Sequence, residues 1–321
     1  MARESETVKN HALALLFPGQ GSQFPGMGLD IVSEDSKSRE TLALADEILG
    51  YPLSLIMSGK RGEELNHTVY TQPAIFVHSM LVWNMLESRL KLKPLVAAGH
   101  SLGEYSALCA AGVLKFEDAL RLVQTRAEAM NCAQPSGACG MTAVLGVAPD
   151  RIREIIESVK QDSILDIGNY NSPEQFVISG TIDALDRARE ILIREKRSRV
   201  VNLAVSSAFH TELMRPAIET LSSTLNETHI SPAKFRVIAN VTAEPYSNDP
   251  AEIRDTLLRQ VVSPVLWESS VRKMIDFGAS YFIETGPGKV LSGLMKRIDR
   301  SLPAISVSDI EGIKSLQGAF Q

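Results

Sequence analysis

Ser101 lies in a short segment that is typical of a nucleophilic serine. The segment Gly99-His100-Ser101-Leu102-Gly103 matches the pattern G-x-S-x-G and stands between an apolar run at 95–98 and a helical run of small residues at 104–111. At such a strand–turn–helix junction the serine sits on a strained turn with its hydroxyl oxygen exposed. The N–H groups and positive dipole end of the following helix stabilise a developing oxyanion. Ordinary Gly-Ser turns share the pattern, so a partner base is needed to indicate catalysis.

His210 is the best-placed base among the six histidines of the chain. It follows an expected strand at 199–203 and the small residues at 206–208, where the chain should return to the larger part of the fold. His100 adjoins Ser101, but a neighbour on a sharp turn points elsewhere. We interpret His67 and His78 as surface histidines without a catalytic role. A Ser101–His210 pair would support acyl transfer through a serine ester.

Arg126 stands on the apolar side of an expected helix at 115–132, three residues after Val123 and four before Met130. An arginine in that position either pairs with a carboxylate of the protein or lines a polar pocket. A guanidinium that lines a pocket can hold a carboxylate with two parallel hydrogen bonds, but the residues by themselves leave both alternatives open.

The elements that position these residues alternate between strands and helices. Short apolar runs bounded by turn residues predict buried strands, and longer runs with a helical period predict helices. Alternation of the two indicates a parallel sheet covered by helices. The expected strands are 12–17, 95–98, 235–241 and 280–283, and the expected helices are 36–49, 72–90, 104–111, 115–132 and 290–298.

The middle of the chain has a different order of elements, strand–helix–strand–strand–helix–strand, which is that of a ferredoxin-like unit. The expected strands are 141–147, 164–169, 175–179 and 199–203, with helices at 149–160 and 182–194. We therefore predict an α/β protein with two subdomains. Residues 1–138 and 206–321 form the large one with a parallel sheet, and residues 139–205 form a small ferredoxin-like one inserted into it.

Composition limits the class of protein. The 321 residues carry a net charge of −5, which argues against a nucleic-acid partner. Cys109, Cys132 and Cys139 lack CxxC spacing and suggest free thiols in a reducing compartment. No apolar run reaches about 18 residues, so no membrane span is expected. The polar start at 1–10 and the short run at 12–17 do not resemble a signal peptide. We expect a cytoplasmic protein without a metal site.

Seven segments occur in an order that resembles the malonyl-coenzyme A:acyl carrier protein transacylase family, which serves fatty acid and polyketide synthesis. The resemblance covers roughly residues 12–300, and the ordered set is far more specific than any one segment. It implies an α/β-hydrolase-like core with an inserted ferredoxin-like subdomain. The segments are FPGQGSQ at 17–23, GHSLGE at 99–104, Arg126, MTAVLG at 141–146, NSP at 171–173, AFH at 208–210 and ETGPGKVL at 284–291.

The resemblance also implies catalytic roles. Ser101 is the nucleophile and His210 its base, and the backbone N–H groups of Gln20 and Leu102 form the oxyanion hole. No Asp or Glu at a motif position completes a triad. The family instead orients its histidine through a backbone carbonyl, at the position of Gln260.

Four further residues are implied in substrate binding. Arg126 would bind the free carboxylate of the malonyl group, and Met130 and Asn171 would contact the substrate. A phenylalanine at the position of Phe209 accompanies malonyl use, whereas methylmalonyl-selective relatives carry a smaller serine. One methyl group changes binding by only about 1–3 kcal/mol, so this preference should be incomplete.

The implied reaction is a ping-pong transfer of malonyl from malonyl-coenzyme A to the phosphopantetheine thiol of an acyl carrier protein, without a bound cofactor. One alternative is a hydrolase that clears acyl groups from carrier proteins, but related hydrolases tend to lack the arginine found at 126. Another is a silent protein that only docks carrier proteins, which would not need to keep Ser101, His210, Gln20 and Arg126. The basic residues between 187 and 199 form either a solvated face or a docking surface for an acidic carrier protein.

Overall fold

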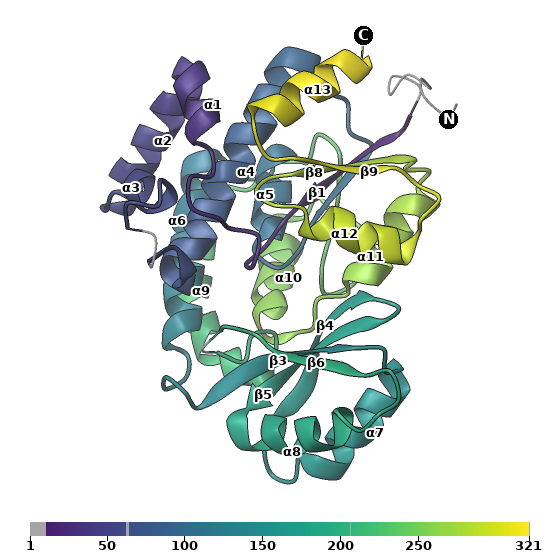
Figure 1. Ribbon diagram of the computed structural model, residues 1–321. Coiled ribbons are helices and arrows are strands. Elements are labelled where there is room, and N and C mark those ends of the chain that lie inside the picture. Colours follow the sequence, from purple (N-terminus) through teal and green to yellow (C-terminus); the bar gives the residue numbers. More distant parts are fainter. Residues whose placement is uncertain (1–10, 62–63, 206, 321) are drawn as a thin grey trace.

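The larger of two sheets lies in the upper part of the molecule in Figure 1 and is parallel throughout. The computed structural model describes residues 11–61, 64–205 and 207–320. The strand order is β7-β2-β1-β8-β9, which places β1 in the middle. The five strands are β1 (Leu13–Phe17), β2 (Val96–Gly99), β7 (Arg236–Ile238), β8 (Tyr281–Thr285) and β9 (Ala304–Val307).

Strand β1 shows why its sequence is apolar at every position. Leu13, Leu15 and Phe17 pack into the core on one face of the sheet, and Ala14 and Leu16 pack into the core on the other. Successive side chains of a strand point to opposite faces, and helices cover both faces here. The predicted parallel strands are therefore confirmed, and neither face of β1 meets water.

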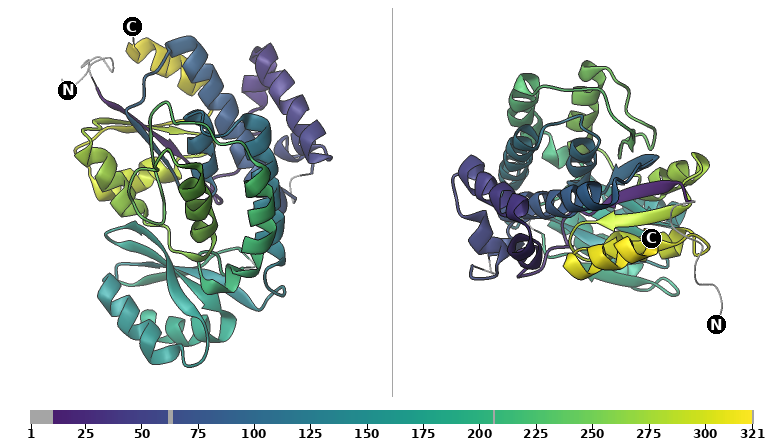
Figure 2. Two further views of the ribbon diagram at one scale, coloured as in Figure 1. Left: turned by 180° about the vertical axis from the view of Figure 1, so that it is seen from behind. Right: turned by 90° about the horizontal axis from the view of Figure 1, so that it is seen from above.

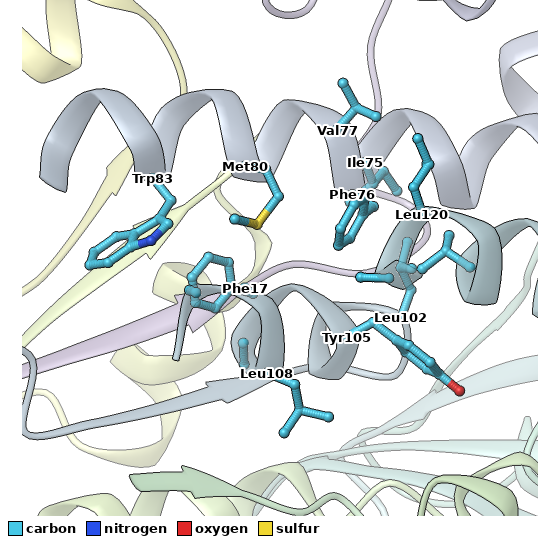
Figure 3. Close-up of a cluster of buried hydrophobic side chains, with 14 of the residues drawn as sticks. Phe17, Ile75, Phe76, Val77, Met80, Trp83, Leu102, Tyr105, Leu108 and Leu120 are labelled. Atoms are coloured by element: carbon cyan, nitrogen blue, oxygen red, sulfur yellow. The ribbon is translucent and has the colours of Figure 1, made fainter. Parts of the chain in front are cut away.

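Two layers of helices enclose this sheet (Figures 1 and 2). Figure 3 shows one layer from within, where Phe17 of β1 packs below Met80 and Trp83, with Tyr105 and Leu108 alongside. That layer contains α4 (Thr68–Leu90), α5 (Gly103–Ala110), α6 (Phe116–Cys132) and α13 (Ile310–Phe320), and the opposite layer contains α11 (Trp267–Asp276) and α12 (Val290–Ile298). Farther out lie α1 (Leu29–Glu34), α2 (Ser36–Leu49), α3 (Leu53–Met57), α9 (Pro216–Glu227) and α10 (Pro250–Val262).

The smaller sheet is antiparallel with the order β4-β5-β3-β6, which confirms the predicted ferredoxin-like unit. Its outer face packs on two helices through Val144 and Ile178, while Ala143 and Val177 belong to the core shared with the larger part. This inner face therefore forms one wall of the space between the sheets. The elements are β3 (Cys139–Leu145), α7 (Pro149–Val159), β4 (Leu165–Ser172), β5 (Gln175–Thr181), α8 (Ile182–Leu192) and β6 (Arg199–Asn202).

Some elements differ from the sequence prediction. Helix α4 begins at Thr68, four residues earlier than expected, and contains Pro73. Strand β7 ends at Ile238 rather than at residue 241, because Ala239 turns back to bond Glu244 and leaves the sheet. Helices α1, α3, α9, α10, α11 and α13 and strand β9 were not predicted. Within the described residues, no helix has the length and apolarity to cross a membrane.

Candidate active site

Ser101 occupies a strained turn between β2 and α5, at the carboxyl end of the parallel sheet. Its φ angle is +52°, in the left-handed region that residues other than glycine rarely adopt. The flanking glycines make this turn possible: a Cβ atom on Gly103 would lie 2.0 Å from the Phe17 carbonyl oxygen, and one on Gly99 would lie 1.8 Å from Gly103. The spacing G-x-S-x-G therefore reflects the close approach of β1, β2 and α5.

His210 lies between the serine and a backbone carbonyl. Its Nε2 is 2.8 Å from Ser101 Oγ, and its Nδ1 is 2.9 Å from the Gln260 carbonyl oxygen. Because a carbonyl can only accept, Nδ1 carries the proton and Nε2 is free to accept one from the serine. Burial, followed by the nearby Arg126 charge, lowers the pKa of His210 to about 3. The ring is therefore neutral at pH 7, as a base must be.

Three backbone N–H groups belong to residues that line the cavity beside the nucleophile and are candidates for an oxyanion hole, those of Gln20, Ser101 and Leu102. The Ser101 N–H donates to Asn240 Oδ1 at 2.8 Å and is occupied. The backbone N–H groups of Leu102 and Gln20 donate no hydrogen bond within the described part of the chain. Both residues line the cavity at Ser101. The Gln20 side chain is held by Thr68, with Nε2 to Oγ1 at 3.2 Å. Such rigid donors can bind an oxyanion.

Arg126 reaches the serine from α6. Its guanidinium is buried and donates from Nη1 to Gln72 Oε1 at 2.6 Å, and from Nη2 to Gln260 Oε1 at 2.9 Å and Ser101 Oγ at 3.0 Å. No carboxylate of the described residues forms a salt bridge with it, so the structural ion pair considered from the sequence is absent there. The hydrogen bonds of the guanidinium go to neutral oxygens of Gln72, Gln260 and Ser101. The positive charge remains available to an anion.

A cavity of about 250 Å³ opens beside these groups, between the inner face of the smaller sheet and the carboxyl ends of the larger one. Phe209 is buried in its wall, and its carbonyl oxygen accepts from Ser179 Oγ at 2.7 Å. Asn171 also lines it, with Oδ1 2.8 Å from His100 Nε2. His100 thus turns away from the serine, as expected. The lining includes Gln20, Gln72, His100, Ser101, Leu102, Arg126, Met130, Met141, Ala143, Asn169, Asn171, Gln175, Val177, Phe209, His210, Val290, Leu291 and Leu294.

Three polar residues at this site were missed by the sequence analysis as functional candidates. Gln72 holds the Arg126 guanidinium, and Asn240 holds the Ser101 N–H. Glu104 is fully buried three residues after the serine, and burial raises its pKa to about 7. The sequence did contain one indication that Asn240 belongs to the site. It follows a parallel strand, and active sites form at the carboxyl ends of such strands.

Comparisons with known proteins identify the family. The acyl transferase domain family matches residues 14–316. A malonyl CoA-acyl carrier protein transacylase of Bacillus subtilis is 41% identical over 303 residues, covering 94% of this chain and 95% of that protein. The transacylase of the same name from Haemophilus influenzae is 40% identical, covering 95% of this chain and 97% of that protein.

Solved structures agree with the sequence relatives. The structure of the malonyl CoA-acyl carrier protein transacylase of Coxiella burnetii has a TM-score of 0.93 and 34% identity, and the match covers 97% of this chain and 98% of that one. A malonyl-transacylase in complex with its type II PKS acyl-carrier protein has a TM-score of 0.91 and 37% identity, covering 95% of this chain and 99% of that one. The chain therefore belongs to the acyl transferase domain family, as one of its malonyl CoA-acyl carrier protein transacylases.

Proposed function

We propose that this enzyme transfers the malonyl group of malonyl-coenzyme A to the phosphopantetheine thiol of an acyl carrier protein through an ester on Ser101. The observation that carries the proposal is the 3.0 Å contact between Arg126 Nη2 and Ser101 Oγ. In a malonyl group, a single methylene separates the carboxylate from the thioester carbonyl. A receptor for that carboxylate must therefore lie beside the nucleophile, as this guanidinium does.

In the first half-reaction, His210 Nε2 takes the proton of Ser101 Oγ as the oxygen attacks the thioester carbonyl. The N–H groups of Leu102 and Gln20 stabilise the resulting oxyanion. The oxyanion then collapses, the carbon–sulfur bond breaks, and coenzyme A leaves with the proton from His210. The carbonyl of Gln260 holds the ring throughout, and its dipole stabilises the imidazolium that forms.

In the second half-reaction, the phosphopantetheine thiol of the carrier protein takes the place of coenzyme A. His210 accepts its proton while the sulfur attacks the malonyl ester, and the same proton returns to Ser101 Oγ as the ester bond breaks. Malonyl-coenzyme A is thus a substrate, and the steps require no further cofactor.

Substrate choice follows from the groups around the serine. Arg126 binds the malonyl carboxylate, which replaces the hydrogen bond from Nη2 to Ser101 Oγ. Phe209 crowds the carbon that bears the extra methyl of a methylmalonyl group, and Met130 and Asn171 complete the wall. A hydrolase acting on plain acyl groups would have no use for a buried guanidinium at this point, which disfavours the hydrolase alternative.

We also propose that the chain divides into a large catalytic subdomain, 1–138 with 206–321, and a small one, 139–205. Residues 1–10, 62–63, 206 and 321 of that division lie outside the described residues. The second sheet spans residues 139–202, which supports these limits. The three cysteines are free, which supports action in the reducing cytoplasm.

The test is to incubate the protein with equimolar malonyl-, methylmalonyl- and acetyl-coenzyme A and to record its intact mass. We expect a malonyl adduct on the native protein, none on Ser101→Ala, and transfer of the adduct to an added holo acyl carrier protein. Rapid release of free acid without transfer would refute the proposal in favour of a hydrolase. A predominant acetyl adduct would refute the role of Arg126.

A further inference from the structure

Glu104 is a buried carboxyl group that the mechanism above does not use. It lies in the first turn of α5, three residues after the nucleophile. Its Oε1 accepts hydrogen bonds from the Asn240 backbone N–H at 3.0 Å and from the Tyr246 hydroxyl at 2.6 Å. Its Oε2 accepts from Gln260 Nε2 at 2.5 Å. Both oxygens thus accept hydrogen bonds, and each is connected to the active site through one of its partners, Asn240 or Gln260.

The hydrogen bonds of Gln260 connect Glu104 with Ser101, Arg126 and His210. The side-chain Nε2 of Gln260 also donates to the Ser101 carbonyl oxygen at 2.8 Å, and its Oε1 accepts from Arg126 Nη2 at 2.9 Å. Its backbone carbonyl accepts from His210 Nδ1 at 2.9 Å. The amide can present oxygen to Arg126 only while its nitrogen faces acceptors on the other side.

Asn240, the partner of the other Glu104 oxygen, holds the turn that carries Ser101. Asn240 Oδ1 accepts from the Ser101 N–H at 2.8 Å, and Nδ2 donates to the Gly99 carbonyl oxygen at 2.7 Å. The N–H that Glu104 accepts is part of the Asn240 backbone and cannot change direction without moving the chain. Glu104 therefore links the strained turn to the residue that orients both Arg126 and His210.

We propose that Glu104 is a positioning residue for malonyl transfer, which fixes the orientation of the Gln260 amide so that its oxygen faces Arg126. This inference rests on the proposed function, because it concerns the arginine that recognises the malonyl carboxylate. Protonation of Glu104 is compatible with the role. The Tyr246 hydroxyl can accept a proton placed on Oε1, and Oε2 then remains an acceptor for Gln260.

Replacement by glutamine separates this role from packing, because Glu104→Gln keeps the shape but exchanges one acceptor for a donor. The fixed Asn240 N–H keeps the new amide oxygen on its side, so the new NH₂ group faces Gln260 Nε2. Two donors cannot remain in contact, so the Gln260 amide turns over at the expense of its bond to the Ser101 carbonyl oxygen. Its NH₂ group then faces the guanidinium of Arg126, which loses an acceptor and is repelled.

The experiment compares acyl loading on Ser101 in the native protein, Glu104→Gln and Tyr246→Phe. Each protein is loaded with malonyl- and acetyl-coenzyme A and is labelled with a fluorophosphonate, which reports on Ser101 and His210 without the acyl pocket. We expect Glu104→Gln to lower the ratio of malonyl to acetyl loading at least about 10-fold while fluorophosphonate labelling changes less than about 3-fold. Tyr246→Phe removes a hydrogen bond from Glu104 Oε1 only, and leaves the bond from Gln260 to Oε2. It should therefore keep the native ratio of malonyl to acetyl loading.

An unchanged malonyl-to-acetyl ratio in Glu104→Gln overturns the inference, even if all rates fall. If that variant does not fold, Gln260→Met removes the same amide and keeps the backbone carbonyl for His210. It should show the same selective loss, and an unchanged ratio overturns the inference there too. A native protein that labels with fluorophosphonate but takes no malonyl group refutes the proposed function instead. The crystal structure of Glu104→Gln is a second test of the inference. A shift of Arg126 away from Gln260 supports it, and an unmoved Arg126 overturns it.

Discussion

Replacement of Arg126 by alanine gives the sharpest test of substrate recognition. The guanidinium is 1% exposed and already points two nitrogens at the site, so a malonyl carboxylate can bind it without rearrangement of α6. Each hydrogen bond between charged groups contributes about 1.5–3 kcal/mol. Two of them amount to about 3–6 kcal/mol, which corresponds to about 10²–10⁴-fold in kcat/KM for malonyl-coenzyme A.

Acetyl-coenzyme A provides the internal reference for this variant, because its acyl group has no carboxylate to lose. The rate of Ser101 acylation is measured by quenched-flow mass spectrometry with each thioester, so a general loss of reactivity affects both. We expect Arg126→Ala to reduce malonyl loading by the stated factor and acetyl loading far less. Arg126→Lys keeps the positive charge but loses the two-pronged hydrogen bonding of the guanidinium. Its rate of malonyl loading should therefore lie between those of the native protein and Arg126→Ala.

Folding must be controlled, because Arg126 also satisfies the side-chain oxygens of Gln72 and Gln260. Arg121→Ala removes an exposed arginine from the same helix and should leave both loading rates unchanged. Thermal unfolding of all variants separates lost recognition from lost structure. Native malonyl loading by Arg126→Ala, or an equal fall for both thioesters in a folded variant, would refute the reasoning.

Four further predictions concern other parts of the molecule. Phe209→Ser should raise methylmalonyl loading relative to malonyl by about 5- to 150-fold, since one methyl is worth about 1–3 kcal/mol, and competition between the two thioesters measures it. Gly103→Ala should abolish soluble expression or lower the melting temperature strongly, because its Cβ would meet the Phe17 carbonyl oxygen at 2.0 Å. Arg194→Glu with Lys196→Glu, on the exposed end of the small subdomain, should raise KM for the acyl carrier protein and leave malonyl loading intact; unchanged carrier kinetics would exclude docking there. Burial raises the pKa of Glu104 from 4.5 to about 7, so its contribution to stability is present below pH 4.5 and is lost as pH rises through 7. The free energy of unfolding of the native protein relative to Glu104→Gln should therefore fall by about 2–3 kcal/mol from pH 5 to pH 8 in urea titrations.

The sequence by itself determined the local parts of this protein. The apolar runs gave the central strands because both faces of a parallel sheet are buried, and the pattern of 139–202 gave the ferredoxin-like order. The glycines around Ser101 marked a tight strand–helix turn, and the position of Arg126 on an apolar face marked a buried cation. Each element, turn or buried position was indicated by residues within a few positions of one another, and the ferredoxin-like order followed from the succession of such elements.

Tertiary structure alone decided how distant side chains meet. Ser101 and His210 are separated by 109 residues, and Arg126 and Gln260 by 134, so no periodicity relates them. The family resemblance pointed to Gln260 for its carbonyl, but the contacts of its side-chain amide with Glu104, Arg126 and Ser101 depend on how the fold brings the end of α10 to residues of α5 and α6. A buried polar group must satisfy its hydrogen bonds with whatever packing brings near. Those partners are set by the whole fold rather than by neighbours along the chain.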